Sequence, residues 1–197
     1  MKKGQITKEK VIRQAMNLIH TKGVGSTSMN DIIAATGVKK GNLYFHFTTK
    51  EELAVQAIEE ARRHYTRYLA SSLTGDSALE KLENLIDAIV AFHKKRKVRG
   101  GCIFGNTAIE TGGKSSPLTV LIRKIFSEWA DQIEDLTREA LDAKDGKAGP
   151  DPAALAKTII STLEGAIMMA KLTGRVDDLS DCSDTLKQMI RCVMAAS

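Results

Sequence analysis

Apolar residues recur every three or four positions along most of the chain, which is the period of an α-helix with one buried side. The first such stretch predicts a helix over about residues 7–21, whose buried stripe is Val11, Ala15, Leu18 and Ile19. Lys22-Gly23 then ends this helix. Because no stretch alternates apolar and polar residues over the length of a strand, the pattern predicts an all-α protein without a sheet.

Two short helices separated by a tight turn are predicted next. Ser26-Thr27-Ser28 supplies hydroxyl caps for a helix over about residues 28–35, and Asp31 stands three residues beyond Ser28, as in a capping box. Gly37 favours the left-handed turn that glycine adopts without steric cost, and a third helix follows over about residues 39–45. This arrangement is typical of a helix-turn-helix, whose second helix enters the DNA major groove, although an ordinary helical hairpin gives the same periodicity.

Longer helices are predicted for most of the rest of the chain, and about nine helices are expected in total. Thr48 or Thr49 can cap a fourth helix, in which Glu51 and Glu52 favour the positive end of the helix dipole. The later long helices are predicted to open near Asp76-Ser77, beyond Pro117, at Pro152 and near Cys182. The stretch from Ala143 to Pro152 is rich in Gly, Lys, Asp and Pro, and we interpret it as an exposed loop between helices.

The two C-terminal helices have more apolar residues than a single buried side needs. Residues 152–173 carry them on nearly every face, so this helix needs two partners. The last helix, over about residues 182–195, presents Leu186, Met189, Ile190 and Val193. These two helices are therefore expected to pair with their copies in a four-helix dimer interface; the alternative is a core helix within one chain.

Charge is distributed unevenly over the 197 residues. The chain has 29 basic and 24 acidic residues, a net charge of +5, but residues 1–50 alone carry nine basic and two acidic residues. The first quarter thus holds +7 and the remainder −2. A compact cationic end attracts a phosphate backbone, although the same polarity can merely aid solubility.

The composition argues against several other classes of protein. Without a secretory leader or an apolar run of about 18 residues, a cytoplasmic protein is expected. The three cysteines and four histidines are widely spaced and form no Cys-x-x-Cys or metal-ligand pair, so no disulfide framework, metal or cofactor is predicted. Gly113-Lys114-Ser115 lacks the leading glycine of a phosphate loop, since residue 108 is alanine. The rivals to DNA binding are an enzyme and a helical adaptor; the adaptor predicts weak, salt-insensitive association with DNA.

Residues 27–47 read TSMNDIIAATGVKKGNLYFHF and are followed by Lys50-Glu51-Glu52-Leu53. The string combines a capped helix, a Gly-Val turn, a Tyr-x-x-Phe close and a Lys-Glu-x-Leu opening at fixed offsets. Over about residues 7–55 it resembles the N-terminal signature of the TetR family of transcriptional regulators. The resemblance implies a helix-turn-helix DNA-binding domain over residues 1–50 and a helical ligand-binding and dimerisation domain over residues 51–197. It further implies a homodimeric repressor that leaves a palindromic DNA operator when a small-molecule inducer binds.

The resemblance also implies which residues contact DNA. They are Thr27, Ser28, Lys39, Lys40, Gly41, Asn42, Tyr44, His46 and Lys50. Lysine can reach a guanine edge or a phosphate, asparagine can read adenine, and Gly41 lets the backbone approach the groove. The hydroxyl of Tyr44, together with His46 and Lys50, would contact phosphates, whereas Thr27 and Ser28 either donate to a phosphate or only cap the second helix. Phe45 and Phe47 are expected to serve the small core.

A ligand pocket is implied for the helical body. The candidate lining residues are Phe92, Cys102, Phe104, Trp129, Met168 and Lys171, although apolar residues at helical spacing are core more often than ligand contacts. The stretch from Arg99 to Asn106 resembles a Gly-Cys segment of a subset of the family. Neighbouring positive charge favours a thiolate, so Cys102 is either a sensor of electrophiles or oxidants, with Lys171 near it, or a small buried residue at a helix start.

Overall fold

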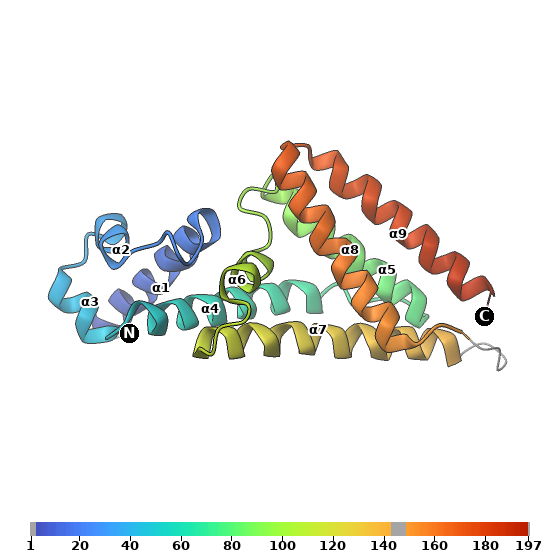
Figure 1. Ribbon diagram of the computed structural model, residues 1–197, viewed down its shortest axis with the longest axis horizontal. Helices are drawn as coiled ribbons and strands as arrows, with labels where there is room; N and C mark the ends of the chain where they lie inside the picture. The colour runs from blue at the N-terminus through green and yellow to red at the C-terminus, as the bar shows by residue number, and fades with distance from the viewer. Residues whose placement is uncertain (1–2, 143–148, 197) are drawn as a thin grey trace. The chain divides into compact units, whose positions relative to one another are not determined.

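The structure is a computed structural model in which residues 3–142 and 149–196 are described. These residues form nine α-helices and no β-strand, which confirms the predicted all-α class (Figure 1). The helices are α1 (Lys3–Lys22), α2 (Met29–Thr36), α3 (Lys40–His46), α4 (Lys50–Ala70), α5 (Ala78–Lys95), α6 (Ile103–Thr111), α7 (Pro117–Asp142), α8 (Pro152–Thr173) and α9 (Val176–Ala196). Of the loop expected over residues 143–152, residues 143–148 lie outside the described part of the chain, and Pro152 begins α8.

The chain divides into two compact units. The first consists of Met1–Tyr65 and Cys102–Lys124, so it contains α1 to α3, most of α4, all of α6 and the start of α7. The second consists of Thr66–Gly101 and Ile125–Ser197 and contains α5, α8 and α9 with the remainder of α4 and α7. The domain boundary predicted at residue 50 falls at the start of α4, within the first unit, and stays a prediction.

A small apolar core holds α2 and α3 against the rest of the first unit. Its members in the first three helices and directly after them are Val11, Ala15, Ile19, Ile32, Leu43 and Phe47. Their spacing on α1 is the stripe predicted from the sequence, except that Leu18 is only half-buried. Since burying one such side chain contributes roughly 1.5–3 kcal/mol, this core is large enough to fix two short helices that would not be stable alone.

The turn between α2 and α3 depends on Gly37. This residue has φ 66° and ψ 11°, in the left-handed region, and its N–H donates to the carbonyl of Ile33 at 2.8 Å, which closes the end of α2. A residue with a Cβ would be strained by roughly 1–2 kcal/mol in this conformation. The predicted glycine turn is therefore confirmed, and α3 begins three residues later at Lys40.

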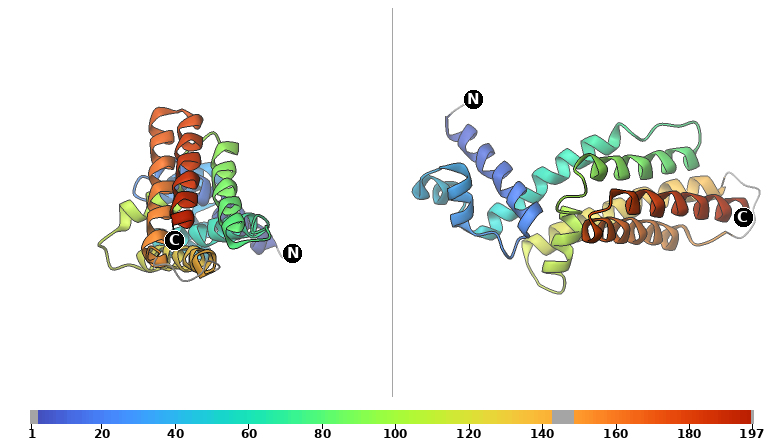
Figure 2. Two further views of the ribbon diagram at one scale, coloured as in Figure 1. Left: turned by 90° about the vertical axis from the view of Figure 1, so that its right-hand side faces the viewer. Right: turned by 90° about the horizontal axis from the view of Figure 1, so that it is seen from above.

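In the second unit, α9 packs along α8 on one side and along α5 on the other (Figure 2). Two ion pairs fasten α9 to α5. Arg191 donates through Nε and Nη2 to the two carboxylate oxygens of Glu83 at 2.6 and 2.7 Å, and Lys187 Nζ lies 2.6 Å from Asp87 Oδ1. The hydrogen bond from Arg191 lowers the pKa of the Glu83 carboxyl. Because these pairs hold one face of α9 against α5, a partner of α9 would have to contact another face.

Two helices begin earlier than predicted. The start of α9 is Val176 rather than about residue 182, and the start of α1 is Lys3 rather than about residue 7. The buried positions of α9 are Leu179, Ser183, Leu186, Ile190 and Met194. Because the small polar Ser183 occupies one of them, the apolar period is interrupted in the sequence, and the first turns of α9 resemble a polar loop.

Candidate nucleic-acid interface

One side of α3 is fully buried and the opposite side is exposed. Leu43, and Phe47 at the end of the helix, are each 0% exposed. Successive residues of a helix are about 100° apart, so Phe45, two positions from both, points almost directly away from the core. Its side chain is 83% exposed. The expectation that both phenylalanines serve the core is therefore confirmed for Phe47 and wrong for Phe45.

The exposed side of α3 also carries most of the predicted recognition residues. Lys39, Lys40, Gly41 and Asn42 are exposed, and Tyr44 is 41% exposed. The ammonium nitrogen of Lys40 lies 6.0 Å from the centre of the Tyr44 ring, a distance at which the cation and the ring attract each other. A Cβ added at Gly41 would meet no atom within 4 Å. Glycine here leaves the helix backbone itself open to a partner surface.

The first turn of α2 is held by reciprocal capping, as predicted. Ser28 Oγ accepts from the Asp31 N–H at 3.1 Å, while Asp31 Oδ2 accepts from the N–H and the hydroxyl of Ser28 at 2.8 and 2.5 Å. These hydrogen bonds from Ser28, with a further contribution from Lys22, lower the pKa of Asp31 to about 2. Since both donors of Ser28 and the N–H of Asp31 are engaged, the donors left for a phosphate are the amides of Met29 and Asn30, which have no acceptor within the helix.

Thr27 and Ser28, expected either to donate to a phosphate or only to cap the second helix, occupy different environments. Thr27 is 1% exposed, and its hydroxyl donates to the carbonyl of Gly23 at 2.7 Å. It closes the turn between α1 and α2. Ser28 follows it on the surface as the N-cap of α2. In this structure, therefore, Thr27 orders the turn and Ser28 reaches solvent.

Lys50 connects the start of α4 to the turn before α2. Its Nζ donates to the carbonyl of Gly25 at 3.0 Å. The cap predicted for residue 48 or 49 is Thr49, whose Oγ1 accepts from the Glu52 N–H at 3.1 Å. An ammonium group has three N–H donors, so Lys50 can hold this turn and a phosphate at the same time.

His46 lies at the end of α3 between an exposed ring and a buried ring. It is half-buried, with its ring 5.2 Å from that of Phe45 in an edge-to-face arrangement and 6.3 Å from that of Phe47. Packing against Phe45 restricts the orientation of both side chains. The imidazole is thus placed beside the exposed face of α3 rather than at its centre.

Several basic residues among the first 50 make contacts within the first unit. Lys10 Nζ donates to the carbonyl of Thr36 at 2.7 Å, at the negative end of α2, where a cation is favoured. Lys22 pairs with Asp31 at 3.4 Å, and the ammonium of Lys8 lies 5.7 Å from the ring centre of Phe47. Some basic side chains of the predicted cationic end therefore stabilise the first unit, while others are exposed on its surface.

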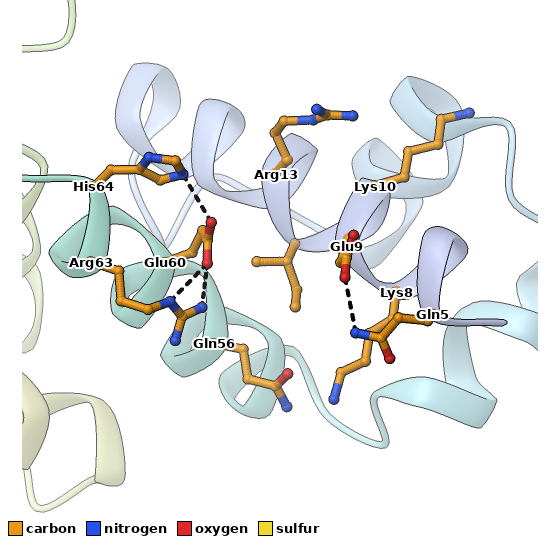
Figure 3. A pocket seen from close by; sticks show the side chains of 10 residues that line it. Gln5, Lys8, Glu9, Lys10, Arg13, Gln56, Glu60, Arg63 and His64 are labelled. Carbon is orange, nitrogen blue, oxygen red and sulfur yellow. Dashed lines mark hydrogen bonds and ion pairs between the residues drawn. The ribbon is translucent and has the colours of Figure 1, made fainter. Parts of the chain in front are cut away.

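A hollow of about 700 Å³ lies between α1 and α4 (Figure 3). Its lining consists of Gln5, Lys8, Glu9, Lys10, Ile12, Arg13, Gln56, Glu60, Arg63 and His64. Glu60 binds Arg63 on the same helix, which lowers the pKa of the carboxyl, and His64 Nε2 lies 2.8 Å from Glu60 Oε1. Apart from Ile12, the side chains that line this hollow are charged or polar, unlike those of the apolar pockets that enclose small ligands. None of the predicted ligand residues belongs to it.

The predicted ligand residues divide between the two units. Cys102 and Phe104 are buried in the first, and the ring centre of Phe104 lies 5.7 Å from that of Tyr65. Cys102 is the N-cap of α6, and its Sγ accepts from the Gly105 N–H at 3.4 Å. This position matches the interpretation as a small buried residue at a helix start; the sensor role stays a prediction.

The other four predicted ligand residues belong to the second unit. The ring of Phe92 lies 5.2 Å from that of Tyr68, and the ring of the half-buried Trp129 lies 5.0 Å from that of Phe126. Met168 is 54% exposed, and Lys171 is also exposed. Phe92 and Trp129 thus lie in aromatic pairs, whereas the two residues of α8 lie on its surface.

Sequence reasoning missed one contact between the turn before α2 and a distant part of the chain. The carboxylate of Glu110, on α6, accepts from the N–H groups of Val24 and Gly25 at 3.1 and 2.6 Å. The partners are 86 and 85 residues apart, so no local pattern indicates the contact. The exposure of Phe45 did have a signal, because it stands two positions from the apolar residues Leu43 and Phe47, and residues two apart on a helix point in nearly opposite directions.

The described helices therefore define a class: an all-α protein that presents a short recognition helix on a capped helix-turn-helix. The family model described as "Bacterial regulatory proteins, tetR family" matches residues 11–57, and "Tetracyclin repressor-like, C-terminal domain" matches residues 78–186. The chain belongs to the TetR family of transcriptional regulators. It is a DNA-binding helix-turn-helix protein of that family and not an enzyme.

Similar proteins extend the match over nearly the whole chain. A TetR transcriptional regulator from Chloroflexus aurantiacus is 32% identical, with 97% of each chain covered and a TM-score of 0.88. A regulatory protein TetR from Rhodobacter sphaeroides is 26% identical, with 91% of this chain and 96% of that chain covered and a TM-score of 0.80. The transcriptional repressor DhaR of a Mycobacterium species is 25% identical over 84% of this chain and 82% of its own length.

Proposed function

We propose that the protein is a homodimeric repressor that reads a palindromic operator through α3 and releases it when a small molecule binds. The observation that carries the proposal is the exposed face of α3, which presents two lysines, an amide, a phenol and a phenyl ring opposite a fully buried side. Base edges in the major groove offer hydrogen-bonding groups and thymine methyl groups that match these side chains. The similarity to DhaR, a repressor by name, supports repression.

The proposed contacts fall into two groups. Lys39, Lys40 and Asn42 reach base edges or adjacent phosphates, and Gly41 allows the backbone to approach them. Phosphates on either side of the groove are bound by the first-turn amides of α2, which Ser28 caps, and by Tyr44, His46 and Lys50, while Thr27 orders the turn before α2. The first group gives specificity, and the second fixes the position of α3 on the duplex.

We infer that a second copy of the chain binds α8 and α9. Met168, Met169 and Leu172 on α8 and Met189 on α9 are large apolar side chains with exposed fractions of 54, 46, 77 and 60%. By length and composition α8 is apolar enough to cross a membrane, contrary to the expectation from the sequence, and 33% of its most apolar stretch is buried within the chain. A four-helix interface with the copies of α8 and α9 covers these side chains, so that no membrane is needed to keep them from water.

Ligand release follows from the geometry of a dimer on DNA. Half-sites of such regulators lie about one helical turn apart, so a small change in the separation of the two α3 helices prevents both from docking. A ligand that binds the wrongly spaced form more tightly weakens DNA binding by that difference in affinity. The proposed ligand residues are Phe92, Cys102, Phe104, Trp129, Met168 and Lys171. A regulator of this kind acts on DNA in the cytoplasm.

Selection of bound duplexes from a random pool tests the proposal. We expect the enriched sequence to contain two inverted half-sites with centres about 10 base pairs apart. A single half-site would contradict the dimeric palindrome. If no sequence is enriched and DNA association is weak and insensitive to salt, the chain acts as a helical adaptor instead.

A further inference from the structure

The turn between α1 and α2 is built around the carboxylate of Glu110. Oε1 accepts from the Val24 N–H at 3.1 Å, and Oε2 accepts from the Gly25 N–H at 2.6 Å. A Cβ at Gly23 would lie 2.4 Å from Oε1, and one at Gly25 would lie 3.3 Å from Oε2. Gly23 also has φ +88°, which an L side chain rarely adopts. The two glycines leave space that the carboxylate fills.

The same turn supports two parts of the proposed DNA surface. The carbonyl of Gly25 accepts from Lys50 Nζ at 3.0 Å, and the carbonyl of Gly23 accepts from the Thr27 hydroxyl at 2.7 Å. Glu110 thus holds the N–H side of Gly25 while Lys50 holds its carbonyl side. A movement of Gly25 therefore displaces the ammonium of Lys50, and a movement of Gly23 displaces the start of α2.

We propose that Glu110 is a positioning residue for DNA binding, which fixes the α1–α2 turn so that Lys50 and the start of α2 meet the phosphates in register. This inference rests on the DNA-binding surface proposed above. Hydrogen bonds to an ionised acceptor are short and about twice as strong as neutral ones, which suits a fixed backbone position. Glu110 acts through the turn and not on the DNA, because a carboxylate next to a phosphate would repel it.

Loss of the negative charge and loss of the positioning contact should change the operator affinity of Glu110→Gln in opposite directions. Removing a negative charge from a DNA-binding unit by itself strengthens DNA binding. Loss of the fixed turn instead weakens binding of the selected operator by about tenfold, and the slope of log affinity against log salt becomes shallower by about 1 as the Lys50 contact is lost. The matched control is Asp131→Asn, which makes the same charge change at an exposed position of α7 in the second unit.

Two further measurements separate the alternatives. Glu110→Asp keeps the charge but shortens the side chain, so it should weaken binding as Glu110→Gln does. In the free protein, either variant should speed hydrogen exchange at the amides of Val24 and Gly25, with the unfolding temperature close to that of the wild type. Operator binding by Glu110→Gln that is as tight as by Asp131→Asn, or unchanged exchange at both amides, overturns the inference.

The free-protein exchange also separates failure of this inference from failure of the proposed function. If the wild-type chain binds no duplex selectively, the DNA-binding surface is wrong and the DNA role of Glu110 falls with it. If the wild type binds its operator but the amides of Val24 and Gly25 exchange as before in both variants, only the role of Glu110 is wrong.

Discussion

Phe45 is the most exposed large apolar side chain among the described residues. Burying a phenylalanine side chain contributes roughly 1.5–3 kcal/mol, yet this one is 83% exposed in the middle of the polar face of α3. Its neighbours on that face, Gly41 and Asn42, leave its ring accessible. Apolar contact with the 5-methyl group of thymine is a known way to read a base in the major groove. We therefore expect Phe45 to contribute to operator specificity.

Phe45→Ala should weaken binding of the selected operator by about fivefold to tenfold without changing its salt dependence, because no phosphate contact is lost. Stability should change by less than about 0.5 kcal/mol, as at other exposed positions. Replacing operator thymines one at a time with deoxyuridine supplies the control. At one position the deoxyuridine substitution should weaken operator binding by the wild type but not by the variant. Equal effects on both proteins at every position would contradict contact between Phe45 and a thymine methyl group.

Asp31 gives α2 a defined acid sensitivity. Its pKa is about 2 in the folded chain and 3.8 ordinarily, first because Ser28 donates to its carboxylate. A carboxyl whose pKa is lower in the folded state stabilises it above the unfolded pKa, and this contribution is lost as the pH falls through the folded pKa. The difference in urea midpoint between the wild type and Asp31→Asn should therefore shrink between about pH 4 and pH 2. A difference that stays constant over this range would show that the capping box is not formed in solution.

The helix-turn-helix contains two glycines that have different structural roles. Gly37 has φ +66° and ends α2, whereas Gly41 lies within α3 in ordinary helical conformation with open space around it. The first is required by the backbone of the turn. The second weakens its helix, and we attribute its presence to the proposed approach of DNA to α3.

The pair Gly37→Ala and Gly41→Ala tests this distinction. Gly37→Ala should destabilise the first unit by roughly 1–2 kcal/mol. Gly41→Ala should stabilise it by roughly 0.5–1 kcal/mol, because alanine is the better helix former, and yet weaken operator binding, since the methyl group stands between α3 and the groove. Thermal unfolding and anisotropy titration measure the two effects. Unchanged or tighter operator binding by Gly41→Ala would contradict the close approach of α3.

How far the elements could be predicted depends on how local their determinants are. The capping box of Ser28 and Asp31 and the glycine turn at Gly37 were predicted correctly, because each needs only residues within a few positions. The start of α9 was missed because Ser183 interrupts its apolar stripe, and a small serine is buried there only because of the helices that pack on it. The contact of Glu110 with the α1–α2 turn is set by tertiary structure alone.

The proposed binding to a palindromic operator requires two copies of the chain. A single recognition helix contacts too few base pairs for a specific site, and a dimer doubles the contacts at a spacing fixed by its interface. The exposed apolar side chains of α8 and α9 supply that interface in the proposal. Their removal should separate the chains without unfolding them, because the core residues of both helices are a different set.

The double variant Leu172→Glu with Met189→Glu should be monomeric by sedimentation, since it places four carboxylates in the interface of a dimer. Its operator affinity should fall by about a hundredfold or more, because the half-sites are then bound independently. Val120→Glu is the matched control, as Val120 is 63% exposed on α7 in the first unit. A double variant that remains dimeric would place the interface elsewhere.

The proposed docking of α3 in a DNA groove, with phosphates held on either side, is measured by fluorescence anisotropy titration of the selected operator at several salt concentrations. The titration compares the wild type with Tyr44→Ala combined with Lys50→Ala. The double variant should lose about a hundredfold in operator affinity, and its slope of log affinity against log salt should be shallower by about 1. Unchanged affinity and slope in a folded variant would contradict this docking of α3.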